Sequence, residues 1–401
     1  MVGFKTISEI LDIAKGKKVN SSQIKTKNSV PYLLIDTLRG KEPEFFTEDT
    51  KYTEANERDI LMVFDGANSG LVGSGLKGAV GSTIGRLRPK KDICSKYITY
   101  FLFYNFSSLN QDVKGSAIPH VKPKKLLDLK IRFPSLEEQQ QIVEEIEKQF
   151  TRLDASVKDL KGVKGKLEVY KKSVLKAAFQ GLFTNDREQK KEMEVLGFNL
   201  LIPKSWSVGK LSDLGNYGRG KSKHRPRNDR ILYENGKYPF IQTGDISRAN
   251  KTVRDYNQSY NEIGLKQSKM WPKGTLCITI AANIAKTAIL NFDACFPDSV
   301  IGFNSKSEKK TLFVMYYIQL IQQILDIKAS ATAQKNINLG TFMKTNFPVI
   351  DEKLMEEIVN KIESKFSVID KLEEYVDSAL TKTEQLRKSI LKSAFEGKLV
   401  K

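Results

Sequence analysis

The stretch SILKSAFEG, at residues 389–397, ends a long helical pattern and has an earlier copy, SVLKAAFQG, at residues 173–181. Six of the nine residues are identical, and the other three are conservative exchanges of Val for Ile, Ala for Ser and Gln for Glu. The copies lie 216 residues apart, from Ser173 to Ser389, in a chain of 401 residues. A repeat of this length predicts one plan used twice, a globular domain followed by a long helix.

Other matches keep the same order through both halves of the chain. They are ISEI at 7–10 with LSDL at 211–214, Gly-Lys at 16–17 with Gly-Lys at 220–221, SAIPHV at 116–121 with TAQKNI at 332–337, and IVEEIEKQF at 142–150 with IVNKIESKF at 358–366. Chance matches would not hold one order, so we predict an internal repeat with a pseudo-two-fold arrangement.

Each half begins with a globular pattern of mixed α and β character. Short β-like runs, YLLI at 32–35 and DILMVF at 59–64, recur as PFIQ at 239–242 and TLCITI at 275–280. The apolar segments YITYFLFYNF at 97–106 and LFVMYYIQLIQQIL at 312–325 favour buried helices. NDREQKKEME at 185–194 is charged and turn-like. The predicted parts are a first domain at 1–134, a long helix at 135–182, a linker at 183–205, a second domain at 206–350 and a second long helix at 351–401.

The segments that end in the repeated motif carry the spacing of long helices with one apolar seam. Apolar residues recur every three or four positions, as they do in paired helices. The seams are Val143, Ile146, Phe150, Leu153, Val157, Leu160, Leu167, Val174 and Ala178, and then Val359, Ile362, Phe366, Ile369, Val376, Leu380, Ile390 and Ala394. A helix of roughly 65 Å is unstable alone, so we expect the two helices to pair. The alternative is that each packs only on its own domain.

The pairing should be antiparallel. Two equal helices joined through a globular domain can return beside each other only in that direction, so SILKSAFEGKLV should pack on residues 1–134.

Gly162 and Gly165 interrupt the first seam and should each cost about 1 kcal/mol relative to Ala. The residues expected to make the helix and domain contacts are Phe150, Phe179, Phe366, Phe395 and Leu399. The expected fold is α+β, with two mixed domains and a long antiparallel coiled coil.

The composition favours a polyanionic partner. The formal net charge is +19, from 66 Lys and Arg against 47 Asp and Glu, and nucleic acid is the simplest partner for that excess. Three cysteines, Cys94, Cys277 and Cys295, are too few and scattered for a disulfide framework or a thiolate metal site. With no secretory signal and no apolar run long enough to span a membrane, a cytoplasmic location is expected.

Motifs for catalysis are weak or missing. Gly73, Gly75 and Gly78 match G-x-G-x-x-G, but a strand-like run follows, so a turn between strands is the better interpretation. The chain has no G-x-x-x-x-G-K-[ST], no NPPY-like tetrapeptide, and no metal-ligand spacing around His120 or His224. The E-x-K sequence at Glu363 lies on the helical repeat, where its charges fit a solvated face. We therefore expect no catalytic residues and no metal site.

Basic and polar clusters are more informative. Lys15, Lys17 and Lys18 stand where Arg219, Lys221 and Lys223 stand in the second half, and such side chains contact phosphates. Arg225, Lys77 and Lys286 add to the basic candidates. Polar side chains beside them are candidates for base contacts, although each taken singly could be an ordinary surface residue. These are Thr37, Arg39 and Asn68 in the first half, and Gln242, Thr243, Asp245 and Asn283 in the second.

The whole chain resembles the DNA-specificity subunit of type I restriction–modification enzymes. Four features carry the resemblance: both copies of LK[AS]AF[QE]G, ATAQKNI at 331–337 with its weaker partner SAIPHV, the FP-containing strand before EEQQQIVEEIE, and the half-repeat of about 216 residues. The terminal stretch LRKSILKSAFEGKLV at 386–400 is quite specific to that family. SAIPH departs from the pattern because it lacks the QKN of the second copy.

The resemblance implies a non-catalytic subunit. Each globular domain would be a target recognition domain for one half of a bipartite site in double-stranded DNA. The paired helices would act as a spacer and carry two modification (methyltransferase) subunits, with separate restriction or motor subunits in the assembly. S-adenosylmethionine, ATP and Mg would be bound by those partners and none by this chain. The alternatives are a coiled-coil scaffold with incidental positive charge, and an enzyme with an unfamiliar site.

Overall fold

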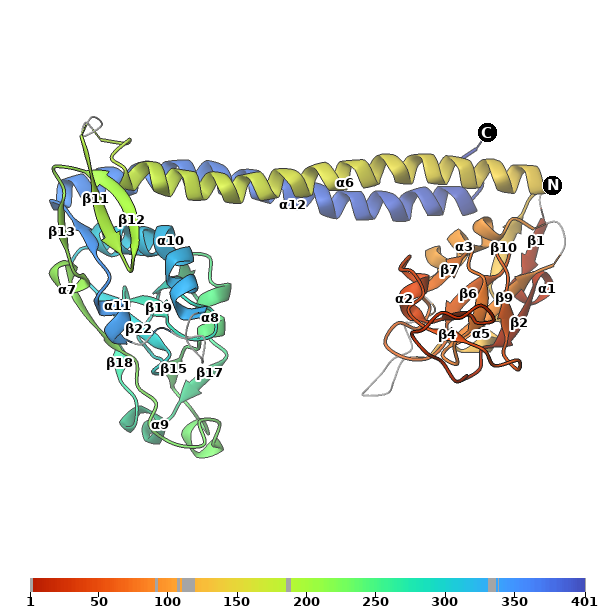
Figure 1. Ribbon diagram of the computed structural model, residues 1–401, viewed down its shortest axis with the longest axis horizontal. Coiled ribbons are helices and arrows are strands. Elements are labelled where there is room, and N and C mark those ends of the chain that lie inside the picture. Colours follow the sequence, from red (N-terminus) through yellow and green to blue (C-terminus); the bar gives the residue numbers. More distant parts are fainter. Residues whose placement is uncertain are drawn as a thin grey trace. The chain divides into compact units, whose positions relative to one another are not determined.

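The computed structural model describes residues 3–90, 93–106, 109, 120–184, 189–330, 337 and 339–400. Most of the two segments SAIPHV and ATAQKNI lies outside the described residues. The chain forms two compact units. Unit 1 is Met1–Gly162 with Val376–Lys401, and unit 2 is Val163–Tyr375. Each unit therefore contains one globular domain and a part of both long helices (Figure 1).

The globular domain of unit 1 contains two four-stranded sheets. One has the order β2-β9-β6-β7 and is antiparallel, with β2 (Leu11–Lys15), β9 (Ile84–Pro89), β6 (Ile60–Val63) and β7 (Val72–Ser74). The other has the order β4-β3-β8-β5, with β4 (Phe46–Thr47), β3 (Val30–Leu33), β8 (Gly78–Val80) and β5 (Glu54–Ala55), and its β3 and β8 are parallel. β1 (Gly3–Thr6) pairs with β10 (Lys130–Phe133), just before the long helix.

Unit 2 repeats the plan of two sheets. Its first sheet is β14-β22-β19-β20-β16, with β14 (Asn216–Arg219), β22 (Val300–Asn304), β19 (Leu276–Thr279), β20 (Thr287–Leu290) and β16 (Thr252–Val253). Its second is β17-β15-β21-β18, with β17 (Gln258–Tyr260), β15 (Tyr238–Phe240), β21 (Ala294–Cys295) and β18 (Met270–Trp271). β13 (Ser207–Gly209) pairs with β23 (Phe347–Val349) as β1 pairs with β10. The predicted internal repeat is confirmed.

Helices also occur at corresponding places in the two units. The pairs are α1 (Ile7–Ile10) with α7 (Leu211–Leu214), α2 (Ile35–Leu38) with α8 (Thr243–Arg248), α3 (Ser95–Tyr104) with α10 (Glu308–Ser330), and α5 (Pro123–Leu127) with α11 (Leu339–Met343). Unit 2 adds η1 (Arg230–Leu232) and α9 (Glu262–Lys266). The buried helices predicted from the two apolar segments are α3 and α10, each lying between its sheet and the long helices (Figure 1). No helix in the described ranges is long and apolar enough to cross a membrane.

A β-hairpin occupies most of the segment predicted to be a linker. It consists of β11 (Lys190–Val195) and β12 (Phe198–Pro203) and belongs to unit 2. Met193, Val195 and Ile202 are buried in the core of that unit. The linker prediction was wrong there because charged and apolar residues alternate in EMEV, at 192–195. Such alternation gives one solvated and one buried face in a strand.

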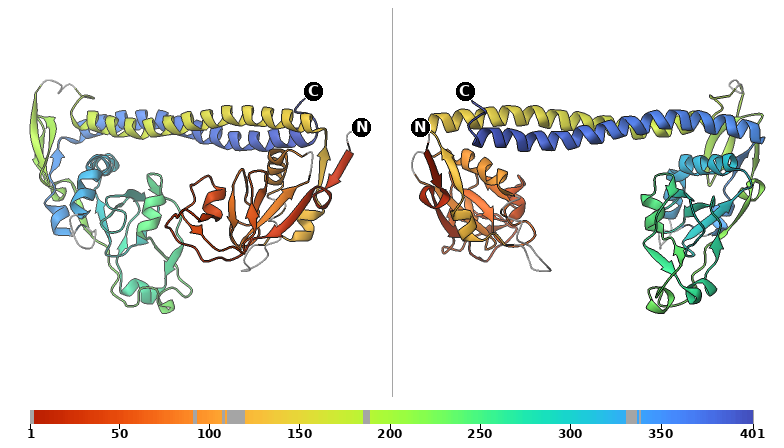
Figure 2. Two further views of the ribbon diagram at one scale, coloured as in Figure 1. Left: turned by 45° about the vertical axis from the view of Figure 1, so that its right-hand side comes forward. Right: turned by 180° about the vertical axis from the view of Figure 1, so that it is seen from behind.

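The two long helices are α6 (Leu136–Phe179) and α12 (Glu352–Phe395), each of 44 residues. In unit 1, Arg387 forms an ion pair with Asp154 and lies over the Phe150 ring. In unit 2, Lys171 forms ion pairs with Asp370 and Glu373. As the residue numbers of the contacting residues increase along α6, those of their partners on α12 decrease, so the helices are antiparallel. They lie side by side within each unit (Figure 2).

Glycine does not break α6. The helix continues through Gly162 and Gly165, and a Cβ atom added to either glycine would meet no atom within 4 Å. Seam residues are buried at several places along the helix pair, as at Ile146, Ile362 and Ile369. Val157 and Leu160, nearer the middle of α6, are only half-buried. Leu167, Val174 and Ile369 form a buried cluster between the two helices themselves.

The final phenylalanine of each long helix enters a globular core. In unit 1, the Phe395 ring lies 5.3 Å from Tyr97 and from Phe101, measured between ring centroids. In unit 2, the Phe179 ring lies 5.0 Å from Phe313 and 5.3 Å from Tyr317. Each residue of the unit 1 contact lies one repeat length from its counterpart in unit 2: Tyr97 from Phe313, Phe101 from Tyr317, and Phe395 from Phe179. The internal repeat therefore preserves these aromatic contacts. Leu399 packs on the same core as Phe395.

A second aromatic pair joins each long helix to its domain. Tyr100 meets Phe150 edge to face at 5.8 Å, and Tyr316 meets Phe366 at 5.6 Å with the same interplanar angle of 89°. The tyrosine hydroxyls donate to carboxylates on those helices, Tyr100 to Glu147 and Tyr316 to Glu363. Burial and, secondly, Glu147 raise the pKa of Tyr100 to about 12. Each pair therefore combines an aromatic contact with a hydrogen bond.

Replacing Phe395 by Ala should loosen unit 1 and leave unit 2 protected. The substitution removes a buried ring that contacts three aromatic residues of unit 1, and we expect a local loss of roughly 3–5 kcal/mol. Phe179→Ala should do the reverse. Amide hydrogen exchange on both variants measures the protection of each unit separately. Equal loosening of both units by either variant would contradict the assignment of these rings to separate cores.

Candidate nucleic-acid interface

The repeated Gly-Lys dipeptide marks the point where the chain passes from one sheet of a domain to the other. The Gly16 amide donates to the Ile84 carbonyl at 2.8 Å, and the Lys17 amide donates to the Val80 carbonyl at 3.1 Å. In unit 2 the Gly220 and Lys221 amides donate to the carbonyls of Val300 and Phe296, at 2.8 and 3.0 Å. Both units thus place a lysine at the same structural position.

Glycine is required at this crossing because the neighbouring backbone leaves no space for a side chain. A Cβ atom on Gly16 would lie 2.1 Å from the Gly81 carbonyl oxygen. One on Gly220 would lie 2.3 Å from the Pro297 carbonyl oxygen. The match between the two dipeptides therefore has a steric cause, and the lysine that follows is held at the end of a strand.

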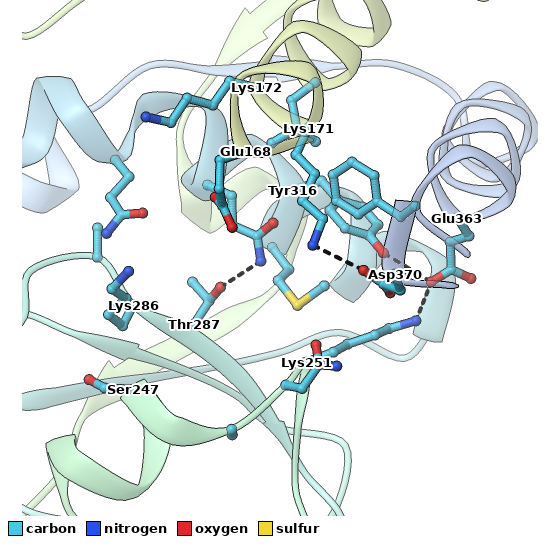
Figure 3. A pocket seen from close by; sticks show the side chains of 18 of the residues that line it. Glu168, Lys171, Lys172, Ser247, Lys251, Lys286, Thr287, Tyr316, Glu363 and Asp370 are labelled. Atoms are coloured by element: carbon cyan, nitrogen blue, oxygen red, sulfur yellow. Dashed lines mark hydrogen bonds and ion pairs between the residues drawn. The ribbon is translucent and has the colours of Figure 1, made fainter. Parts of the chain in front are cut away.

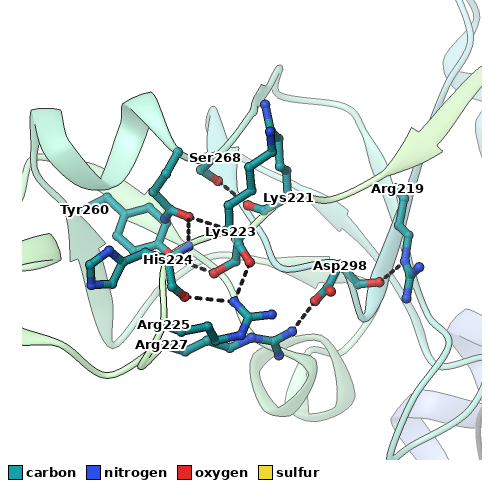
Figure 4. A network of polar contacts seen from close by, with 11 residues as sticks. Arg219, Lys221, Lys223, His224, Arg225, Arg227, Tyr260, Ser268 and Asp298 are labelled. Carbon is teal, nitrogen blue, oxygen red and sulfur yellow. Dashed lines mark hydrogen bonds and ion pairs between the residues drawn. The ribbon is translucent and has the colours of Figure 1, made fainter.

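In unit 2 the basic segment 219–227 is folded against its own neighbours (Figure 4). Arg227 forms an ion pair with Asp298 at 2.6 Å, and the Arg219 guanidinium donates to the Asp298 carbonyl. Arg225 donates to the carbonyls of Ser222 and His224, both at 2.8 Å. The three arginines are thus partly used to shape the segment, and we expect them to contribute less to phosphate binding than free side chains would.

Two lysines of this segment are available to a ligand. The backbone of Lys223 donates to Gln267, and the backbone carbonyl of Lys221 accepts from Ser268, so both positions are fixed by their main chain. Among the described residues, neither ammonium group has a hydrogen bond or ion pair. Figure 4 shows both side chains extending from the segment. Fixed backbones with free ammonium groups suit contacts to phosphate.

The basic cluster of unit 1 is partly neutralised. Lys15 forms an ion pair with Asp65 at 2.8 Å, and His120 lies 2.8 Å from the same carboxylate. Hydrogen bonds from Lys15 and His120 lower the pKa of the Asp65 carboxyl. Among the residues that the structure describes, neither Lys17 nor Lys18 has such an ion pair, and both are exposed. No local pattern pointed to Asp65, or to Asp298 in unit 2, because these acids are far along the chain from the cations they contact.

Two of the predicted base-contacting residues have structural roles instead. Thr37 is 4 % exposed, and its hydroxyl donates to the Leu34 carbonyl at 2.5 Å, so that hydroxyl is not available to a base. Asp245 accepts from the Gln242 amide at 2.8 Å and from Arg248 and Asn257. These bonds cap α8 and tie it to the following loop. The sequence did not distinguish such roles because both residue types are common in caps as well as in binding sites.

The remaining candidates lie on loops and helix ends. Arg39 donates to the Asn68 side chain at 2.5 Å, so two candidates separated by 29 residues come together. The Gln242 side chain donates to Gln258, and Thr243 is half-buried in the first turn of α8. Three further candidates lie in turns: Lys77 between β7 and β8, and Asn283 and Lys286 between β19 and β20. The glycines at 73, 75 and 78 lie in β7, that first turn and β8, as the turn interpretation predicted.

Unit 2 also contains a cleft of about 740 Å³ between its parts of the long helices, α8 and α10 (Figure 3). Lys251 and Tyr316 both bond to Glu363, and Lys171 lies 3.0 Å from Asp370. Burial raises the pKa of the Glu363 carboxyl, but Lys251, Tyr316 and Lys309 together outweigh burial, and the pKa is lowered. These groups form ion pairs between elements. Glu363, the acid of the E-x-K sequence, is accounted for by packing.

No metal centre is evident in the part of the chain that the structure describes. There, no three His, Cys, Asp or Glu side chains gather in a way that could hold a metal ion. What the described surface does offer is a fixed lysine at each sheet crossing, with polar turns nearby. This combination suits a polyanion whose bases expose hydrogen-bond donors and acceptors in its grooves, as duplex DNA does.

Residues 2–161 and 203–374 both match the family described as the type I restriction modification DNA specificity domain. The chain belongs to this family. Among its relatives, it is 27 % identical to the MjaVIII specificity subunit of Methanocaldococcus jannaschii, over 95 % of this chain and 90 % of that protein. It is 23 % identical to the EcoBI specificity subunit of Escherichia coli, over 98 % and 85 %. It is thus a specificity subunit of the type I restriction–modification class.

Solved structures share the fold. One solved chain comes from a study of complex assembly and conformational transition of the type I R-M system. The match covers 99 % of this chain and 98 % of that chain, with a TM-score of 0.75 and 14 % identity. The HsdS subunit from Thermoanaerobacter tengcongensis covers 99 %, with 97 % of it covered, a TM-score of 0.54 and 15 % identity. These two solved chains therefore share the α+β fold with two long helices.

Replacing Asp245 by Ala should lower stability without changing sequence preference. The variant loses the α8 cap and the bonds to Arg248 and Asn257, which we expect to cost about 1–2 kcal/mol. Arg248→Ala is the matched control, since it keeps the cap and removes only the ion pair made by the exposed Arg248 side chain, which we expect to be worth about 1 kcal/mol. Chemical denaturation measures both variants. An unchanged unfolding free energy for Asp245→Ala would contradict the capping role.

Proposed function

We propose that this chain is the non-catalytic subunit that gives a type I restriction–modification assembly its target. Each globular domain contacts one half of a bipartite site in double-stranded DNA. The paired helices α6 and α12 set the distance between the half-sites and carry two methyltransferase subunits, which the restriction or motor subunits join. S-adenosylmethionine, ATP and Mg belong to these partners.

The observation that carries this proposal is the duplicated sheet crossing. Gly16 and Gly220 occupy equivalent positions, and each directs a lysine, Lys17 or Lys221, from the same place in its domain. A structural scaffold with incidental positive charge has no need to fix a lysine in this way twice. A protein that reads two half-sites does need it, because each domain requires its own phosphate contacts for register on the duplex.

The proposal also accounts for the two long helices. In the proposal, these two helices of 44 residues, whose final phenylalanines pack in globular cores, act as the spacer between the half-sites. The exposed faces of the same helices offer a large surface to partner subunits.

Changing Lys221 and Lys223 to Ala should weaken binding to all DNA sequences alike. If both ammonium groups neutralise phosphates, the slope of log affinity against log salt should become shallower by about 0.9 for each phosphate that is no longer neutralised. Fluorescence anisotropy with a labelled duplex, measured over a range of salt concentrations, gives that slope. The wild-type protein in complex with its methyltransferase partner is the reference.

The control variant changes two other exposed lysines of unit 2, Lys204 and Lys353, which lie on other elements. Its slope should equal that of the wild-type protein. If the Lys221 and Lys223 variant keeps the wild-type slope, these residues are not at the DNA interface. A weakening restricted to one DNA sequence would also contradict a phosphate role.

Exchanging residues 190–350 for the same segment of a relative should change only one half of the recognised site. The segment contains the hairpin and all the sheets of unit 2, and unit 1 has its own core. Methylation mapping of DNA from cells that carry the hybrid reads both half-sites at once. The reciprocal exchange of residues 1–134 is the control. A change in both half-sites from either exchange would contradict independent reading.

A further inference from the structure

Corresponding turns emerge in both units beside the basic crossings. In unit 2, Thr279 ends β19 and pairs with Val300, whose neighbour Ile301 pairs with Arg219. In unit 1, the matching register joins Val63 to Ile84 and Lys15 to Gly85. The turn after the central strand and the basic segment therefore leave the same end of the same sheet. In unit 1 the Lys15–Asp65 ion pair joins them directly.

The two turns are closed by the same hydrogen bonds. In unit 1 the Val63 amide donates to the Leu71 carbonyl, and the Gly70 amide donates back to the Val63 carbonyl at 2.7 Å. In unit 2 the Thr279 amide donates to the Lys286 carbonyl, and the Ala285 amide donates back to Thr279 at 2.8 Å. Each closed turn contains an Ala-Asn dipeptide. These dipeptides are 67–68 in unit 1 and 282–283 in unit 2.

The turn of unit 2 is strained where its counterpart is not. Unit 1 places glycines at its two left-handed positions, Gly66 with φ +103° and Gly70 with φ +87°. Unit 2 holds alanines in the left-handed region, Ala282 with φ 63° and Ala285 with φ 54°. Left-handed backbone is unfavourable for residues other than glycine, so it persists only where surrounding contacts impose it.

Several contacts impose this conformation from inside unit 2. The Thr279 hydroxyl donates to the Asn283 carbonyl and accepts from the Lys286 amide at 3.0 Å. Gln322 of α10 donates to the Ile284 carbonyl at 3.2 Å. Ile284 and Ala285 are buried. The turn is thus anchored on one side and projects from the domain on the other.

The projecting residue is Asn283. It is exposed, and within the described residues its amide side chain has no hydrogen-bond partner. Lys286, also exposed, directly precedes β20 and lines the cleft of Figure 3. An asparagine amide offers one donor and one acceptor side by side, which match the N6 and N7 atoms of adenine in the major groove.

We propose that Asn283 is a specificity-determining residue that contacts a base edge in the half-site read by unit 2. The backbone of the turn is anchored, and the turn leaves the same end of the sheet as the segment that carries Lys221 and Lys223. In the corresponding turn of unit 1, the Asn68 side chain accepts a hydrogen bond from Arg39, which follows α2, so the two turns present different groups to a base. This inference rests on the proposed function.

Methylation mapping tests the inference in cells that carry the complete system. Asn283→Ala should relax the methylated motif at one base pair of one half-site. There, the preference for the wild-type base should fall by about 5- to 150-fold, and the other half-site should be unchanged. Asn199→Ala, on the exposed β11–β12 hairpin of the same unit, is the matched control and should keep the wild-type motif.

Four further variants separate base contact from folding. Asn283→Gln, Asn283→Ser and Asn283→Arg change the chemistry of the side chain, and at least one should alter the preferred base at that single position. Ala282→Gly relieves the strain while keeping Asn283, and its motif should stay wild type. The inference is overturned if every Asn283 variant gives either the wild-type motif or no methylation with a lowered melting temperature. If the wild-type system itself yields no two-part motif, the proposed function fails instead.

Discussion

The packing of each long helix's final phenylalanine into a globular core is the contact on which the rest of the structure depends. Phe395 lies among Tyr97, Phe101 and Tyr104, and so the last turns of the chain complete the core of unit 1. Phe179 completes the core of unit 2 against Phe313 and Tyr317. Each unit therefore needs helical segments from both halves of the sequence. Because both sets of contacts must form in one chain, the two helices are obliged to be antiparallel.

This constraint links packing to the proposed function. A helix of 44 residues would fray if only its seam stabilised it, and the seam is half-buried at Val157 and Leu160. Anchors at both ends make the pair a defined element. In the proposal, the same contacts also position Lys17 and Lys221 in each unit. The helices α3 and α10, which pack on the final phenylalanines, lie between the long helices and the sheets whose first strands precede these lysines. Stability and target spacing then have one physical origin.

The sequence predicted the features that depend on a periodic pattern or on the internal repeat. The repeat itself, the two long helices and the buried α3 and α10 are of this kind, since each depends on many residues with one spacing. The hairpin at 190–203 was missed because its charges resemble a linker, although alternate residues are apolar. Individual site residues were harder to predict because their roles depend on partners remote in the sequence. Thr37 is turned inward to its own helix, and Asp245 serves as a cap. The strand registers and hydrogen bonds of the folded chain were needed to bring Lys221 and Asn283 to one sheet end.

The most direct test of the account is a map of adenine methylation in the genome of cells that carry this chain with its partner subunits, compared with cells that lack only this chain. The account predicts a motif of two specified segments separated by a fixed number of unspecified base pairs, which disappears when the chain is absent. A continuous motif, or a motif that persists without the chain, would contradict it.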